Sequence, residues 1–168
     1  IDDSIILSFD PGMLYAEYGV EYIESILKRT NILLINEKEL KILFEDYYKE
    51  KLNINDDKEL SFRDLAVYLR DDGIDTVVVK RGSQGVYAIN KDDFEVKAPA
   101  FEVDAVDTTC AGDSFNAGFL FAYLNEYDLA KSCVIANWVA SKSVQGIGIS
   151  TLATKEELME FIENEFDD

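Results

Sequence analysis

Short apolar runs alternate with helix-like segments through the first half of the chain. The runs contain Ile, Leu or Val without polar alternation, which is typical of strands buried on both faces of a sheet. They are Ser4–Phe9, Ile32–Ile35 and Thr76–Val79. In the segments between them, apolar residues recur every three or four positions, as in amphipathic helices. These are Met13–Lys28, Glu37–Lys49 and Phe62–Arg70. This order predicts a parallel sheet with crossover helices.

The second half of the chain has a different pattern. Two β runs on either side of a glycine-bracketed turn, within Val77–Ile89, predict a hairpin, and Asp93–Val96 predicts a short further strand. Three helices are expected after Pro99, at Ala111–Leu124, Leu129–Gln145 and Lys155–Glu165. The polar segment Asn53–Glu59 is expected to be a loop. Together the elements predict one α/β domain over residues 1–168, with a mostly parallel sheet flanked by helices.

The charge of the chain limits its partners. With 34 acidic and 16 basic residues the net charge is −18, which argues against binding to a nucleic-acid backbone or an anionic membrane. No apolar run is long enough to span a membrane. An anionic ligand would have to be held by backbone N–H groups, a metal ion or a few local cations.

The content of histidine and cysteine narrows the chemistry. Histidine is absent, which excludes a Ser-His-Asp triad and histidine-ligated metals. The two cysteines, Cys110 and Cys133, fit neither a disulfide framework nor a zinc spacing, so we expect a reducing, cytoplasmic location.

The stretch Asp107–Phe115 carries the clearest candidate chemistry. Hydroxyl and carboxyl side chains precede three small residues, and a helical pattern starts at once. Small residues let a ligand approach the backbone, and the first N–H groups of a helix favour an anion. Asp113, in the first turn, could orient a hydroxyl group and accept its proton. Taken alone, however, Thr108 and Thr109 ahead of Asp113 also fit ordinary helix capping.

The longer segment Val103–Phe119 resembles the D-T-x-G-A-G-D-x-F-x-x-G-F motif of ribokinase-like PfkB carbohydrate kinases. The one departure is Cys110, where glycine is commonest. The resemblance implies a ribokinase-like, Rossmann-type three-layer sandwich and an ATP-dependent kinase. It covers about Ile5 to Ile149, so it implies the C-terminal half of the fold, with the N-terminal part and its lid missing.

The resemblance implies roles for residues of this motif. Asp113 would be the catalytic base. The backbone N–H groups of an anion hole would come from Cys110, Ala111 and Gly112. Asp107 and Thr109 match positions that bind an activating monovalent cation such as K⁺.

Three further matches imply the rest of the nucleotide site. Asn36 and Glu39 resemble the N-x-x-E motif, which places the nucleotide and Mg²⁺, here held by Glu39 through water; they also fit a capping box. Lys80, Gly82 and Gly85 resemble the family's turn beside ATP but also fit a plain hairpin. Asn137 matches a position near the adenine or ribose, with a solvent-facing helix residue as the alternative.

One strand end departs from the family. Asp10-Pro11-Gly12 resembles a D-P-N segment, but Gly12 argues against a fructose- or ketodeoxygluconate-type subclass, and a simple turn explains Asp10 equally well.

The sequence does not identify the substrate that accepts the phosphoryl group. We expect a sugar kinase, with a nucleoside kinase or a non-catalytic, nucleotide-binding regulatory module as alternatives and a vitamin or pyridoxal-type kinase ranked below them. The resemblance also implies that the chain alone binds nucleotide weakly and lacks normal turnover. A homodimer is a further expectation. Family dimers often pair through the lid, which this chain lacks, so this chain would associate through its exposed sheet edge instead.

Overall fold

The computed structural model describes residues 4–166, which form two compact units. The first comprises residues 4–81 and 87–96, and the second residues 82–86 and 97–166. The strands are β1 (Ser8–Phe9), β2 (Ile32–Asn36), β3 (Thr76–Lys80), β4 (Val86–Asn90) and β5 (Glu95–Ala98). The helices are α1 (Gly12–Tyr18), α2 (Val20–Leu27), α3 (Glu37–Lys51), α4 (Phe62–Asp71), α5 (Ala111–Leu124), α6 (Leu129–Ser143) and α7 (Lys155–Phe166). The expectation of a single domain over residues 1–168 stays a prediction.

The strands form one sheet in the order β1-β2-β3-β4-β5. β2 pairs in parallel with both β1 and β3, and Asn36 at the end of β2 faces Lys80 at the end of β3. The four residues before Asn36 in β2 and before Lys80 in β3 are all buried, as their unbroken apolar runs predict. The mostly parallel α/β sheet expected from the sequence is confirmed. Its carboxyl edge collects the residues that follow β1, β2 and β3.

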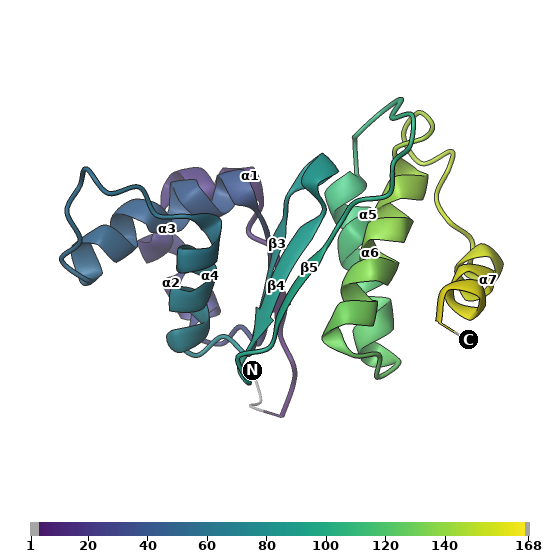
Figure 1. The fold of residues 1–168 in the computed structure, drawn as a ribbon. Coiled ribbons are helices and arrows are strands. Elements are labelled where there is room, and N and C mark those ends of the chain that lie inside the picture. Colours follow the sequence, from purple (N-terminus) through teal and green to yellow (C-terminus); the bar gives the residue numbers. More distant parts are fainter. Residues whose placement is uncertain (1–3, 167–168) are drawn as a thin grey trace. The chain divides into compact units, whose positions relative to one another are not determined.

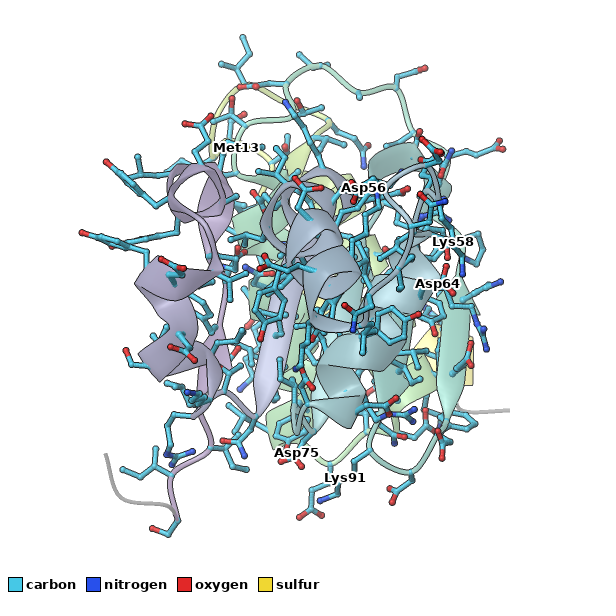
Figure 2. All side chains as sticks on the ribbon, turned by 90° about the vertical axis from the view of Figure 1, so that its left-hand side faces the viewer. Met13, Asp56, Lys58, Asp64, Asp75 and Lys91 are labelled. Carbon is cyan, nitrogen blue, oxygen red and sulfur yellow. The ribbon has the colours of Figure 1, made fainter. Side chains whose placement is uncertain are left out.

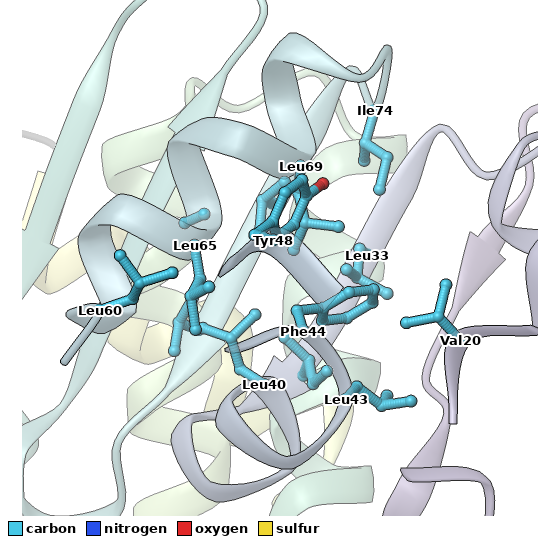
Figure 3. Close-up of a cluster of buried hydrophobic side chains, with 14 of the residues drawn as sticks. Val20, Leu33, Leu40, Leu43, Phe44, Tyr48, Leu60, Leu65, Leu69 and Ile74 are labelled. Atoms are coloured by element: carbon cyan, nitrogen blue, oxygen red, sulfur yellow. The ribbon is translucent and has the colours of Figure 1, made fainter. Parts of the chain in front are cut away.

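The first unit packs α3 and α4 side by side against the sheet (Figure 1). Both helices begin with a capping box, which satisfies N–H groups of their first turns, and their apolar stripes face inward. Figure 3 shows the resulting core. Its labelled side chains are Val20, Leu33, Leu40, Leu43, Phe44, Tyr48, Leu60, Leu65, Leu69 and Ile74. The core therefore fixes the strands whose ends carry the polar residues.

The second unit is built on α5 and α6, which run alongside each other (Figure 1). Their close approach depends on Gly118, because a Cβ there would lie 3.0 Å from the Cα of Ala136 and from Val139. α7 joins this pair through a small apolar core and through Phe161, whose ring stacks 4.6 Å from that of Trp138. α5 is thus closely packed against α6 and shares an apolar core with α7.

Several predicted boundaries need correction. The single helix over Met13–Lys28 is wrong: Gly19, with φ 85° and ψ 169°, divides it into α1 and α2. Of the predicted strand Ser4–Phe9, only Ser8 and Phe9 are strand, because Leu7 bonds instead to the side chain and backbone of Asn31. The turn after β3 contains a 3-10 helix at Gly82–Gln84. No helix among residues 4–166 is long and apolar enough to span a membrane.

The core of the first unit predicts a contrast between two residues of α3. Leu40 is fully buried, whereas Ile42 is 45% exposed. We expect Leu40→Ala to lower the free energy of unfolding by about 2–5 kcal/mol, since it leaves a cavity. Ile42→Ala should change it by no more than about 0.5 kcal/mol. Urea unfolding of both variants tests this, and equal losses would contradict the packing described.

Candidate active site

Three parallel strands bring polar residues to one edge of the first unit. Asp10 follows β1, Asn36 ends β2 and Lys80 ends β3. The ammonium group of Lys80 donates to Asp10 Oδ2 at 2.6 Å, and these side chains are only 12% and 27% exposed. In Figure 2, Met13 lies at this end of the unit, whereas Asp75 and Lys91, an ion pair at 3.7 Å, lie at the opposite end. The carboxyl edge therefore holds a half-buried ion pair.

Asp10 also forms the turn that the sequence allowed. Its Oδ1 accepts the N–H of Gly12 at 3.1 Å, while Oδ2 accepts Lys80. The simple-turn explanation of Asp10 is thus incomplete, because the same carboxylate pairs with a lysine 70 residues along the chain.

The predicted capping box at Asn36 and Glu39 is confirmed. Asn36 Oδ1 accepts the N–H of Glu39 at 2.8 Å, and Glu39 Oε2 accepts the N–H of Asn36 at 3.2 Å. Glu39 is only 6% exposed, and burial raises the pKa of its carboxyl group. The Asp10 charge raises this pKa further, whereas the bonds to Asn36 and the charge of Lys80 lower it.

The acidic residues of the described part, 4–166, do not gather into a direct metal cage. No group of three or more Cys, Asp or Glu side chains there could hold a metal ion. Glu39 is close enough to Asp10 and Lys80 for their charges to affect its pKa. Binding of Mg²⁺ through water at Glu39 stays a prediction.

Arg81 was not among the residues predicted from the sequence. Its Nε donates to Glu37 at 2.9 Å, and its guanidinium carbon lies 4.0 Å from the centre of the Phe62 ring. The two contacts fix the chain directly after Lys80. The adjacent pair Lys80-Arg81 was the only signal for it in the sequence.

The start of α5 differs from that of its neighbours. Asn36, Ser61 and Asp128 cap α3, α4 and α6 with side-chain oxygens. Like the short helices α1 and α2, α5 has no side-chain cap, and its N-cap residue is Cys110. Cys110 has φ 62°, a conformation that glycine adopts more readily. The capping role considered for Thr108 and Thr109 is therefore wrong.

The uncapped start leaves backbone donors at the surface. The N–H of Ala111 bonds to Thr108 O at 3.2 Å and that of Ser114 to Cys110 O at 2.9 Å. Gly112 and Asp113 lie between them, are exposed, and receive no side-chain cap. Their N–H groups and the positive end of the helix dipole can therefore bind an anion, with the Asp113 carboxylate in the same turn.

Asp107 ties two loops together just before this turn. Its Oδ1 accepts the N–H of Thr109 and its Oδ2 the N–H of Gly148, each at 2.9 Å. The Thr109 hydroxyl and then these two N–H groups lower the pKa of Asp107 to about 2. The sequence assigned no individual role to Gly148, which has a φ of 61° in the structure. The predicted cation residues Asp107 and Thr109 thus lie together; cation binding itself stays a prediction.

The remaining predicted nucleotide residues also lie in the second unit. The N–H of Gly85 bonds to Gly82 O at 3.0 Å and closes the turn. Asn137 is only 6% exposed, and its Nδ2 donates to Ala98 O at 3.2 Å and to Pro99 O at 2.8 Å. The solvent-facing alternative for Asn137 is wrong.

Known proteins resemble this chain over most of its length. The sequence profile of the pfkB family carbohydrate kinase matches residues 6–156. An uncharacterized sugar kinase of Archaeoglobus fulgidus is 41% identical over 142 residues, which are 84% of this chain and 51% of that protein. An ATP-dependent ribose-1-phosphate kinase of Halopiger xanaduensis is 30% identical over 97% of this chain and 48% of its own.

A solved structure agrees with these matches. The Methanocaldococcus jannaschii nucleoside kinase, a member of the ribokinase family, superposes with a TM-score of 0.73 and 30% identity. The match covers 95% of this chain and 48% of the nucleoside kinase. The ribokinase-like fold is therefore confirmed, and the chain spans about half the length of the relatives it matches.

The low pKa of Asp107 predicts a pH dependence. Its folded pKa of about 2 lies below the usual value of 3.8, so its contribution to stability is present above pH 4 and is lost as the pH falls through 2. The free energy of unfolding of Asp107→Asn should be lower than that of the unsubstituted chain at pH 4, and the gap should narrow toward pH 2. Chemical unfolding at several pH values measures the gap. The exposed neighbour Asp104→Asn is the control, and a gap that stays constant would argue against the two-loop contact.

The raised pKa of Glu39 predicts a change of stability with pH that is opposite to that of Asp107. Because its folded pKa is raised, its ionisation costs stability as the pH rises from 4.5 through that raised pKa. Glu39→Gln keeps the oxygen that accepts the N–H of Asn36 but carries no charge. We expect the variant to match the unsubstituted chain near pH 4 and to be more stable near pH 8. Thermal unfolding across this range tests it; a variant less stable at pH 8 would refute the interpretation.

Proposed function

Because this chain belongs to the pfkB family of carbohydrate kinases, we propose that it is the nucleotide-binding, catalytic part of an ATP-dependent kinase that phosphorylates a hydroxyl group of a sugar. The observation that carries the proposal is the uncapped start of α5, with exposed Gly112 and Asp113 beside it. The free N–H groups of such a helix start can bind water or the oxygens of an anionic ligand.

In the proposed reaction, Asp113 is the catalytic base. The acceptor hydroxyl donates its proton to the Asp113 carboxylate as its oxygen bonds to the γ-phosphorus of ATP. The bond between that phosphorus and the β–γ bridging oxygen breaks, and ADP leaves. Phosphoryl transfer needs good positioning more than a strong base, so a carboxylate near a helix N-terminus suffices.

The transferring phosphoryl group carries negative charge into a chain whose net charge is −18. We assign the charge stabilisation to the N–H groups at the start of α5, contributed by Cys110, Ala111 and Gly112. Since Ala111 N–H already bonds to Thr108 O, its role requires that bond to be shared or exchanged. Backbone donors keep their polarity at every pH and need no basic side chain.

Asn36, Lys80, Gly82 and Gly85 would contact the nucleotide, and Asn137 is assigned to the same nucleotide site. Mg²⁺ would be held by the phosphates and, through water, by Glu39; when bound, it offsets charge on the β- and γ-phosphates. Lys80, paired with Asp10, supplies a further positive charge at the carboxyl edge.

Monovalent-cation activation is a separate part of the proposal. Asp107 and Thr109 would bind a cation such as K⁺ close to the start of α5, and the low pKa of Asp107 keeps its carboxylate charged over the whole range in which a kinase works. A cytoplasmic location and a homodimer are inferred from the composition and from the family resemblance.

The acceptor class has two candidates. The sugar kinase of A. fulgidus favours a carbohydrate, whereas the 30% identical nucleoside kinase of M. jannaschii favours a nucleoside. A regulatory module that binds nucleotide without turnover is the third candidate, and the exposed Asp113 speaks against it. The chain spans about half the length of its relatives. We therefore assign the choice of acceptor to the whole protein and not to this chain alone.

ADP release by the complete natural protein that carries this chain tests the proposal. We expect release that depends on one sugar or one nucleoside in a panel, and that rises when K⁺ replaces a bulky organic cation. Tight Mg-ATP binding with no release for any acceptor would instead support the regulatory module.

Asp113 provides the sharpest variant. Asp113→Asn should lower kcat by about 10²–10⁴-fold, the usual contribution of a general base, and leave the Kd of Mg-ATP nearly unchanged. Asp104→Asn, an exposed carboxylate in the preceding loop, is the matched control and should keep full activity. Undiminished kcat in Asp113→Asn would reject the role as base.

A further inference from the structure

Asn137 makes two hydrogen bonds that leave its own helix. Its Nδ2 donates to the carbonyl oxygens of Ala98 and Pro99, 39 and 38 residues away along the chain. Carbonyl oxygens only accept, so the NH₂ end of the amide must face them, and both of its hydrogens have a partner. The buried Asn137 amide is therefore fully hydrogen-bonded on its NH₂ side and links α6 to Ala98 and Pro99.

The same segment is pressed against Gly85 from another direction. A Cβ on Gly85 would overlap the carbonyl oxygen of Ala98 and would lie 2.7 Å from Ala100 N and 2.8 Å from the carbonyl carbon of Pro99. Gly85 also has φ 83°, a conformation that other residues rarely adopt. The backbone of the glycine turn therefore lies directly on the segment that Asn137 holds.

The turn that ends at Gly85 is short and has an exposed tip. Gly85 N–H bonds to Gly82 O and closes the turn around the 3-10 helix at Gly82–Gln84. Ser83 and Gln84 at its tip are exposed. Pro99 has no N–H, so its carbonyl oxygen is its only backbone hydrogen-bonding group, and this oxygen accepts from the Asn137 amide.

We propose that Asn137 is a positioning residue that, by holding Ala98 and Pro99 against Gly85, sets the conformation of the Gly82–Gly85 turn for the nucleotide. This rests on the function proposed above. In this role the Asn137 NH₂ group does not contact the base of the nucleotide, because both of its hydrogens are donated to the chain's own backbone. A positioning role acts on any nucleotide that uses the turn, whatever its base.

The test uses Asn137→Asp, which keeps the shape of the side chain but turns two donors into a carboxylate facing two carbonyls. Hydrogen exchange of the 82–86 backbone should become at least tenfold faster. The affinities for Mg-ATP and Mg-GTP should fall by the same factor, about tenfold, so that their ratio stays constant. Asn125→Asp is the control, because the Asn125 amide bonds only to Phe121 O, one turn back in α5, and it should change neither readout.

The outcomes separate the possibilities. Unchanged exchange at 82–86 overturns the positioning role, and a changed ATP-to-GTP ratio with unchanged exchange assigns Asn137 to the base instead. If the unsubstituted protein binds neither nucleotide, the proposed function fails, while the exchange data still decide whether Asn137 holds the turn. If Asn137→Asp does not fold, Asn137→Ala removes the donors without adding charge and must give the same pattern for the proposal to stand.

Discussion

The site depends on a helix that starts without a cap. In α3, α4 and α6 a side-chain oxygen accepts an N–H group of the first turn. The short helices α1 and α2 and the long helix α5 lack such a cap, and the N-cap of α5, Cys110, adopts a left-handed conformation. Unsatisfied backbone donors are costly, and they persist only where water or a ligand can reach them. The exposed turn at Gly112 and Asp113 meets that condition. In a chain with net charge −18, such donors can bind phosphate without a basic side chain.

The carboxyl edge of the sheet in the first unit carries a separate set of polar side chains. Parallel pairing of β1, β2 and β3 places Asp10, Asn36 and Lys80 at one edge, so that residues 70 positions apart form an ion pair. The raised pKa of Glu39 comes from burial and from Asp10, and it is moderated by Lys80 and by the cap. The capping box therefore has a structural role that is compatible with a metal-associated one.

Local sequence patterns predicted the helices and caps of the site, whereas the contacts between distant residues became visible only in the structure. Small residues followed by a helical pattern predicted α5 with its observed bounds, and the N-x-x-E spacing predicted the capping box. The break at Gly19 was missed because an apolar stripe continues across it. The bonds of Asp10 to Lys80, of Asp107 to Gly148 and of Asn137 to the segment after β5 depend on tertiary geometry, which no spacing along the chain encodes.

The most direct test of the central claim is an amide NMR titration of the chain with Mg-ADP and with a non-hydrolysable Mg-ATP analogue at millimolar concentration. If the start of α5 is the phosphate site, the N–H resonances of Gly112 and Asp113 shift downfield, as donors to a new anionic acceptor do, and more strongly for the triphosphate. Binding that shifts resonances elsewhere but leaves these two unchanged would contradict the account.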